Sequence, residues 1–235
     1  GSVLMRSAGC IVNDISDKEF DKKVSRTKNR PIASNQVSVK LGIFYTLILC
    51  LLAFLVLINF NNLTILLAIG SMPLAFTYPL MKRFTYWPQL FLGITFNYGL
   101  VLGWTAIQGE ISVMVIIFYL GAIFWTLGYD TIYGYQDIKD DEIIGVKSTS
   151  IKFKKNPKLF LTICYLIFLI SLILVSIFMK LSIIFYFFAV IPTAHLFFYQ
   201  IYNFDFKDPK NCLKIFKSNN LFGAIILCNI LIVRF

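Results

Sequence analysis

Two short acidic clusters stand out in a chain that is otherwise mostly apolar. The first cluster contains Asn13, Asp14, Asp17 and Asp21, and the second contains Asp130, Asp137, Asp140 and Asp141. A carboxylate near hydrocarbon costs at least about 2.5 kcal/mol unless it is paired or solvated. Mg²⁺ favours oxygen ligands and usually binds through a few carboxylates together with substrate phosphates. The two clusters therefore indicate a site for divalent cations and, through them, a polyphosphate.

Helical spacing would give the first cluster a single ligand face. Asp14, Asp17 and Asp21 follow one another at i, i+3 and i+7, which places them on one side of a helix. Asn13 lies four residues before Asp17 and adds a neutral oxygen to that side. Like charges packed this way repel, so we expect a bound cation to hold them together.

The second cluster repeats this logic. Asp130, Asp137 and Asp141 are spaced at i, i+7 and i+11, and Asp140 flanks them. The spacing predicts a second carboxylate face if the helix continues through all of these positions. The alternative is a solvated acidic helix end whose charge is balanced by nearby lysines.

Basic residues follow each acidic cluster within a few turns. Those close enough to reach a diphosphate are Lys22, Arg26, Arg30 and Lys147. Lys and Arg donate strong charge-assisted hydrogen bonds to phosphate oxygens. The competing interpretation is that these charges only fix the orientation of the chain in a membrane.

The elements that must position these residues are membrane-spanning helices. The sequence is 58% apolar, and its mean hydropathy of +0.75 indicates an all-α integral membrane protein with several spans. Apolar runs of a length that crosses a bilayer (about 18–22 residues) occupy 41–59, 63–81, 89–107, 112–130, 158–178, 182–202 and 218–233. Trp87, Trp104 and Trp125 are expected near helix ends, where interfacial aromatic residues gather.

The charges of the connecting loops predict the orientation of the chain. Nearly all of the 22 Lys and Arg residues lie in 18–40, 82–83, 139–158 and 207–217, whereas the alternate connections hold only Lys180. This bias places the basic loops in the cytoplasm or the mitochondrial matrix. All acidic residues except Glu110 share that side, so both clusters can meet at one site. The net charge of +10 is dispersed over several loops, which argues against nucleic-acid binding.

The five cysteines have no metal-binding spacing and are expected to be free. We expect a single membrane-embedded domain over residues 1–235, with no soluble domain boundary. Gly1 to Val12 looks like the last turns of a helix whose start is missing, so a truncated chain is expected.

Three sequence blocks carry a resemblance to the UbiA-type prenyltransferases. The first is Arg6-Ser-Ala-Gly-Cys10 followed by Asn13-Asp14-x-x-Asp17-x-x-x-Asp21, and the second is Tyr129-Asp130 followed by Asp137-x-x-Asp140-Asp141. Between them, the block from Tyr78 to Gln89, YPLMKRFTYWPQ, is similar to the 4-hydroxybenzoate polyprenyltransferase branch. The resemblance covers the whole chain.

This resemblance implies a helical bundle of nine helices around a central cavity, of which about seven plus a stub are present here. It implies Mg²⁺-dependent transfer of a polyprenyl group from its diphosphate to the ring of 4-hydroxybenzoate, ortho to the phenol, in ubiquinone synthesis. The expected location is the bacterial or mitochondrial inner membrane, and no obligate protein partner is evident. The first helix and most of the second would be missing from the chain.

The resemblance also implies residue roles. The expected metal ligands are Asn13, Asp14, Asp17, Asp21, Asp137 and Asp141. The expected catalytic residues are Asp14, Asp17, Asp137, Asp141 and Arg83. The expected substrate-binding residues are Arg6, Asn13, Asp21, Arg26, Arg30, Asp130, Asp140 and Lys147.

Several alternatives stay open at the level of sequence. Arg6 could bind the acceptor carboxylate or form a salt bridge with an Asp, and Arg83 could serve the acceptor site or anchor the chain. The acceptor could instead be a haem, naphthoate or glycerol-phosphate compound. A transporter whose acids line a cation path is the alternative from another class.

Overall fold

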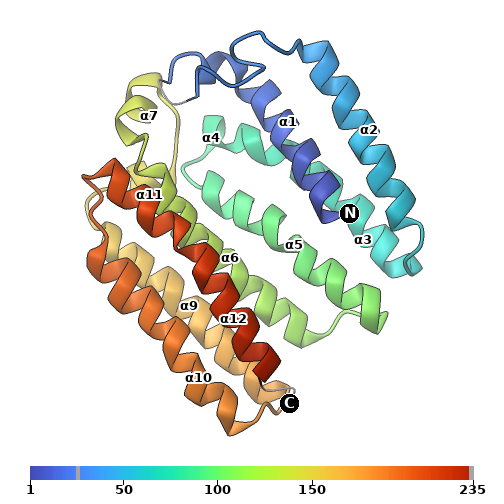
Figure 1. Cartoon of the computed structure of the whole chain (residues 1–235), viewed down its shortest axis with the longest axis vertical. Helices are drawn as coiled ribbons and strands as arrows, with labels where there is room; N and C mark the ends of the chain where they lie inside the picture. The colour runs from blue at the N-terminus through green and yellow to red at the C-terminus, as the bar shows by residue number, and fades with distance from the viewer. Residues whose placement is uncertain (25–26, 233–235) are drawn as a thin grey trace.

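The computed structural model describes residues 1–24 and 27–232 and is helical throughout (Figure 1). The helices are α1 (Ser2–Asp21), α2 (Val39–Leu57), α3 (Asn62–Thr77), α4 (Met81–Phe84), α5 (Pro88–Gln108), α6 (Val113–Gly134), α7 (Ile138–Ile144), α8 (Thr149–Lys152), α9 (Pro157–Phe178), α10 (Ile183–Ala194), α11 (Pro209–Lys217) and α12 (Asn219–Ile232). A 3₁₀ turn, η1 (Tyr78–Leu80), joins α3 to α4, and a π-helical stretch, η2 (His195–Ile201), continues α10. The all-α prediction is confirmed.

Seven helical segments are long and apolar enough to cross a membrane, as predicted. They are Val39–Leu57, Asn62–Phe84, Pro88–Gln108, Val113–Gly134, Pro157–Phe178, Ile183–Ile201 and Pro209–Ile232. The last segment starts well before the predicted 218, because the amphipathic helix α11 leads into α12. Its alternating lysines and apolar residues hide this helix from a hydropathy window.

Local signals in the sequence fix where the spanning helices begin and end. The side-chain oxygens of Ser38, Asn61 and Ser112 accept hydrogen bonds from backbone N–H groups in the first turns of α2, α3 and α6. Such caps satisfy donors that a helix start leaves unpaired. Gly109 ends α5 with a φ of 73°, a left-handed conformation that costs glycine little.

Helix α6 is the centre of the bundle. It packs between α5 and α9, while α1 packs on α2, α3 on α5, and α10 on α12. Two glycines let α6 approach α9 closely: a Cβ at Gly121 would lie 2.5 Å from the Ser171 Cβ, and a Cβ at Gly128 would lie 2.6 Å from the Tyr165 ring. Small residues at such contacts are the usual means of close helix packing in membranes.

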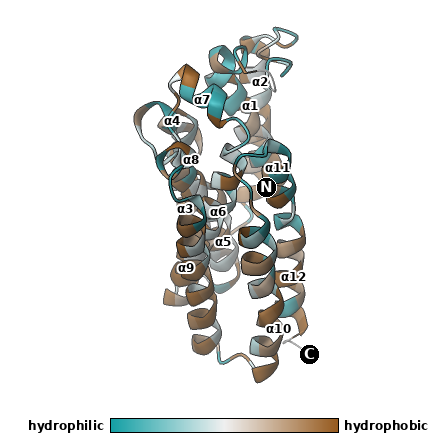
Figure 2. Ribbon diagram, turned by 90° about the vertical axis from the view of Figure 1, so that its left-hand side faces the viewer, coloured by the Kyte–Doolittle hydropathy of each residue, from teal (hydrophilic) through white to brown (hydrophobic). Residues whose placement is uncertain are grey.

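Polar residues gather at one end of the bundle. The C-terminal end of α1, the loop after it and α7 lie together there, and the opposite end is mostly apolar (Figure 2). Trp87 immediately precedes α5, as predicted, but Trp125 lies well inside α6, where the prediction of an interfacial position is wrong. All five cysteines are free, as predicted.

Candidate active site

The first acidic cluster lies on the last two turns of α1, which end at Asp21. Asp17 and Asp21 are buried, and Asn13 and Asp14 are half-buried. The helical face predicted from their spacing therefore exists. It faces the neighbouring elements and not the solvent.

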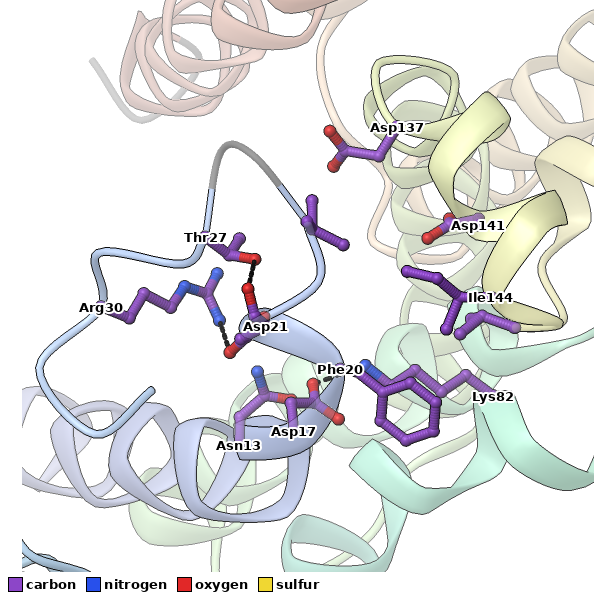
Figure 3. A pocket seen from close by; sticks show the side chains of 12 residues that line it. Asn13, Asp17, Phe20, Asp21, Thr27, Arg30, Lys82, Asp137, Asp141 and Ile144 are labelled. Carbon is purple, nitrogen blue, oxygen red and sulfur yellow. Dashed lines mark hydrogen bonds and ion pairs between the residues drawn. The ribbon is translucent and has the colours of Figure 1, made fainter. Parts of the chain in front are cut away.

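Asn13, Asp17 and Asp21 line a pocket of about 130 Å³ at the polar end of the bundle (Figure 3). Asp137 and Asp141 of the second cluster line the same pocket from the opposite side. Lys82 and Arg30 complete its polar wall. The structure thus brings the two acidic clusters to one site, as the loop charges predict.

Lys82 is the basic residue whose side chain contacts Asp17, the most buried carboxylate of the pocket. Its Nζ lies 2.6 Å from Oδ2 of Asp17, and the Asp17 side chain is only 6% exposed. The second oxygen, Oδ1, is buried and has no hydrogen-bond partner among the described residues. Burial raises the pKa of Asp17, and the Lys82 charge opposes this shift. The free oxygen can accept a further cation or donor.

Arg30 joins two other acids of the first cluster. Its Nη1 donates to Oδ1 of Asp14 at 3.0 Å and to Oδ2 of Asp21 at 3.1 Å. Burial raises the pKa of Asp14, and Arg30 acts in the opposite direction. The loop is also fastened by the Thr27 hydroxyl, which donates to the Asp21 carbonyl oxygen at 3.2 Å.

The second cluster is divided between two helices, which corrects the prediction of one continuous face. Helix α6 ends at Gly134, and α7 begins after Asp137. Asp137 and Asp141 stand one turn apart and line the pocket, whereas Asp130 in α6 and Asp140 in α7 do not line it. The spacing i, i+7 and i+11 fails because the chain turns at residues 135–137.

The acids surround the pocket and do not converge on one point. Within residues 1–24 and 27–232, no three His, Cys, Asp or Glu side chains form a group that could hold one metal ion. Carboxylates on two facing walls, with a free oxygen on Asp17, fit metal ions that are shared with a phosphate ligand lying between the walls. The donor set suits Mg²⁺, since it consists of hard oxygens.

The remaining predicted basic residues lie beside the pocket. Arg83 donates from Nη2 to the Ser16 carbonyl oxygen at 2.6 Å. Lys147 donates from Nζ to the Phe84 carbonyl oxygen at 3.2 Å, and its backbone N–H donates to the Lys82 carbonyl oxygen at 2.9 Å. These bonds hold the segment that carries Lys82 against α1 and against the loop after α7.

The three other basic residues that were candidates for binding substrate differ in what the structure shows of them. Arg6 lies on α1, far along the helix from Asp21, with its guanidinium 5.5 Å from the centre of the Phe96 ring. Lys22 pairs with Glu19 at the surface, at 2.7 Å. Arg26 lies outside the described residues.

Sequence reasoning missed Lys82 as a pocket residue. Lys82 and Arg83 are adjacent in the same block, and the resemblance implies a catalytic role for Arg83 alone of the pair. Sequence alone cannot tell which of two neighbouring basic side chains turns inward, because the 3₁₀ turn η1 changes the helical phase just before them.

A second cavity, of about 170 Å³, lies deeper in the bundle. Its lining comes from four helices: α5, α6, α9 and α12. The residues are mostly aromatic and aliphatic and include Phe118, Trp125, Phe168 and Phe222. Asn97 also contacts this cavity, and its amide donates to Thr126 Oγ1 at 2.7 Å. The bundle therefore combines a polar pocket at one end with an apolar cavity inside.

Comparison with known proteins agrees with this arrangement. The UbiA prenyltransferase family profile matches residues 1–226. The 4-hydroxybenzoate geranyltransferase 2 of Lithospermum erythrorhizon is 42% identical over 99% of this chain and 76% of its own length. The mitochondrial 4-hydroxybenzoate polyprenyltransferase of Bos taurus is 43% identical over 99% of this chain and 62% of its own length.

Solved structures share the fold. A UbiA homologue from Aeropyrum pernix K1 matches with a TM-score of 0.78 at 21% identity, covering 99% of this chain and 86% of that one. A UbiA homologue from Archaeoglobus fulgidus, bound to GPP and Mg²⁺, matches with a TM-score of 0.67 at 17% identity, covering 97% of this chain and 87% of that one. Family profile, sequence identity and fold agree over nearly the whole chain, and this chain therefore belongs to the UbiA prenyltransferase family.

Proposed function

We propose that this protein transfers an isoprenoid group from an isoprenyl diphosphate to 4-hydroxybenzoate, ortho to the hydroxyl group, and releases pyrophosphate. The observation that carries the proposal is the pocket in which Asp17 and Asp21 face Asp137 and Asp141, with Lys82 and Arg30 in the same lining. The acceptor is inferred from relatives above 40% identity that are named for 4-hydroxybenzoate. We further propose that the product serves ubiquinone synthesis.

The pocket suits a diphosphate because it offers both carboxylates that can hold Mg²⁺ and basic side chains that can bind phosphate oxygens. Asn13, Asp17, Asp21, Asp137 and Asp141 line the pocket and, with Asp14 beside it, would hold Mg²⁺, whose charge would neutralise the diphosphate and stabilise the departing pyrophosphate. Lys82 and Arg30 now neutralise carboxylates, and they can exchange these partners for phosphate oxygens when the substrate enters. Asp17 orients Lys82, and Asp14 and Asp21 orient Arg30.

The reaction breaks the allylic C–O bond and one ring C–H bond and forms one C–C bond. The bond between the allylic carbon and the diphosphate oxygen breaks, and both electrons leave with the pyrophosphate that Lys82 and Arg30 bind. The ring carbon ortho to the hydroxyl then bonds to the allylic carbon, and that ring carbon passes its proton to the released pyrophosphate or to water. Water must be kept away from the allylic cation, and the apolar interior beneath the pocket provides this exclusion.

Arg6 is the proposed partner of the acceptor carboxylate. It lies on the same helix as the acidic cluster, its guanidinium contacts the Phe96 ring, and no salt bridge to an Asp or Glu is found for it among the described residues. A guanidinium can bind a carboxylate through two parallel hydrogen bonds. Asp130 and Asp140 are proposed to support the acceptor and the diphosphate from outside the pocket wall.

The apolar cavity is the proposed place of the isoprenoid chain. Its aromatic and aliphatic lining suits a hydrocarbon that is anchored by its diphosphate. The chain length is not fixed by the relatives, since they include a geranyltransferase and a polyprenyltransferase.

The test is an acceptor panel with the purified protein in detergent or nanodiscs. Geranyl diphosphate and a longer polyprenyl diphosphate are each supplied with 4-hydroxybenzoate, a naphthoate or a glycerol phosphate, and products are identified by mass spectrometry. We expect 3-prenyl-4-hydroxybenzoate, formed only with Mg²⁺ and lost with EDTA. A product with another acceptor, or none with any acceptor, contradicts the proposal.

A second readout does not depend on turnover. Mg²⁺ plus pyrophosphate should raise the thermal unfolding temperature, because a ligand at about 100 times its Kd stabilises the folded state by roughly 2.7 kcal/mol. The transporter alternative predicts instead an ion flux in proteoliposomes without prenyl transfer. Membership in a prenyltransferase family favours the enzyme.

A further inference from the structure

A buried hydrogen-bond network crosses the C-terminal half of the bundle. The Tyr165 hydroxyl donates to Oε1 of Gln200 at 2.6 Å, and Nε2 of Gln200 donates to Oδ1 of Asn219 at 3.0 Å. Tyr165 and Gln200 are 0% exposed and Asn219 is 8% exposed. Gln200 lies in the π-helical stretch η2, and Asn219 is the first residue of α12.

The network ends on Trp125. The indole Nε1 of Trp125 donates to the same Asn219 Oδ1 at 3.0 Å. Nδ2 of Asn219 donates to the Phe216 carbonyl oxygen at 3.0 Å, which fixes the orientation of the amide. Since an indole can only donate, Asn219 Oδ1 is the acceptor that holds it in place.

Trp125 is also a wall of the apolar cavity. Its ring packs 5.1 Å from Phe222 and 6.0 Å from Phe168, measured between ring centres, and both of these residues line the cavity with it. Trp125 lies nine residues before the end of α6 at Gly134, which corresponds to about 14 Å along the helix. A chain anchored at the acidic pocket must therefore extend down α6 before it meets this ring.

The indole has one orientation that satisfies both the network and the cavity. Turning it would leave the N–H unpaired in an apolar interior and would move the ring into or out of the cavity. The network thus controls the cross-section of the cavity at the depth of Trp125.

We propose that Asn219 and Gln200 are positioning residues that hold the Trp125 indole against the cavity wall, so that Trp125 determines which isoprenoid chain lengths are accepted. This inference rests on the proposed function, since it takes the apolar cavity as the place of the isoprenoid chain. The residues that touch the chain are those of the cavity, and Asn219 and Gln200 act only through Trp125.

The experiment compares Asn219→Leu, Trp125→Phe and the double variant. The measured quantity is kcat/KM for octaprenyl diphosphate divided by kcat/KM for geranyl diphosphate, with 4-hydroxybenzoate as the acceptor. Each single variant is expected to change this ratio by roughly three- to tenfold, the size expected for the loss of one hydrogen bond. The double variant is expected to shift the ratio no further than Trp125→Phe alone, because both changes break the same contact.

Thr105→Val is the matched control. It removes a buried hydrogen bond between α3 and α5, in which the Thr64 hydroxyl donates to Thr105 Oγ1 at 3.0 Å, and Thr105 does not line the cavity. It should reduce thermal stability and leave the chain-length ratio unchanged. If Asn219→Leu does not accumulate in membranes, Gln200→Leu replaces it with the same expectation.

The outcomes separate the two proposals. If the wild-type protein makes no prenylated 4-hydroxybenzoate from either diphosphate, the proposed function itself fails. If the wild-type protein is active but the ratio is unchanged in Asn219→Leu, or if the two shifts simply add in the double variant, the positioning role is overturned.

Discussion

At the scale of single residues, Asp17 combines three features of a ligand-binding acid in the part of the chain that the structure describes. It is buried, it pairs with Lys82 through one oxygen, and its other oxygen has no partner among the described residues. An uncompensated carboxylate oxygen inside a protein is costly, which argues that Asp17 is kept for a ligand. Because Asp17 is buried, its ion pair with Lys82 is shielded from solvent, unlike an ion pair at the protein surface.

Asp17→Asn is therefore expected to lower kcat by roughly a hundredfold or more, because the carboxylate charge that binds metal and orients Lys82 is lost while the shape is kept. Prenyl transfer in membranes measures the effect, and the yield of folded protein serves as a check. Glu19→Gln is the control on the same helix, since Glu19 is exposed and, among the described residues, pairs with Lys22 at the surface. Equal activity of Asp17→Asn and wild type would exclude Asp17 from the site.

Lys82 and Arg83 can be separated by one substitution each. Lys82→Met should lower kcat/KM by roughly ten- to a hundredfold, because a charge-assisted contact to diphosphate disappears from the pocket wall. Arg83→Met should have a smaller effect, since Arg83 does not line the pocket and contacts the Ser16 carbonyl oxygen and the ring of Phe20 from beside it. The reverse order, measured with saturating acceptor, would assign the larger catalytic role to Arg83, as the resemblance implies.

At the scale of elements, the contact between α6 and α9 supports both the acidic end and the apolar cavity. It brings Tyr165 of α9 against Gly128 of α6 and places Trp125 one turn from that contact. Helix α6 thus carries the cavity wall and leads directly into the turn before Asp137. A substitution that disturbs the packing of α6 should lower the stability of the fold, and any loss of activity should follow from that loss of stability.

Gly128→Ala is expected to destabilise the protein by about 1–3 kcal/mol, because a Cβ would lie 2.6 Å from the buried Tyr165 ring. Thermal unfolding in detergent measures this change. Gly99→Ala in α5 is the matched control, since no atom lies within 4 Å of its Cβ position, and it should be neutral or slightly stabilising. Equal unfolding temperatures for the two variants would contradict the close packing of α6 on α9.

At the scale of the whole molecule, the charges and the site share one end of the bundle. The loop after α1, the segment before α5 and the loop after α7 meet there, and the pocket opens among them. Basic loops are retained in the cytoplasm or matrix, so the diphosphate is expected to arrive from that compartment. Such loops also attract anionic lipid.

Cysteine labelling tests this orientation. In a background with the exposed Cys10 and Cys228 replaced by alanine, Lys155→Cys and Glu110→Cys place single exposed thiols on opposite predicted sides. An impermeant thiol reagent added to intact bacterial cells should label Glu110→Cys and should reach Lys155→Cys only after permeabilisation. The opposite pattern would invert the topology.

The sequence alone predicted the membrane class, the seven spans and the meeting of both acidic clusters at one end. Hydropathy and loop charge are sums over many residues, so predictions based on them do not require knowledge of how the helices pack. The spacing of Asp14, Asp17 and Asp21 also predicted their common face correctly, because α1 is regular to its end. Confirmation of the family rests on the comparisons as well as on these motifs.

Only the tertiary structure decided which side chains share the pocket. The break between α6 and α7 separates Asp130 from Asp137 and Asp141, and the turn η1 directs Lys82 into the pocket beside Asp17. The network from Tyr165 to Trp125 joins four elements that are distant in sequence. Such features depend on the rotation of each helix about its axis and on the contacts between helices. Neither can be read from a single sequence, because both are determined only when the helices pack together.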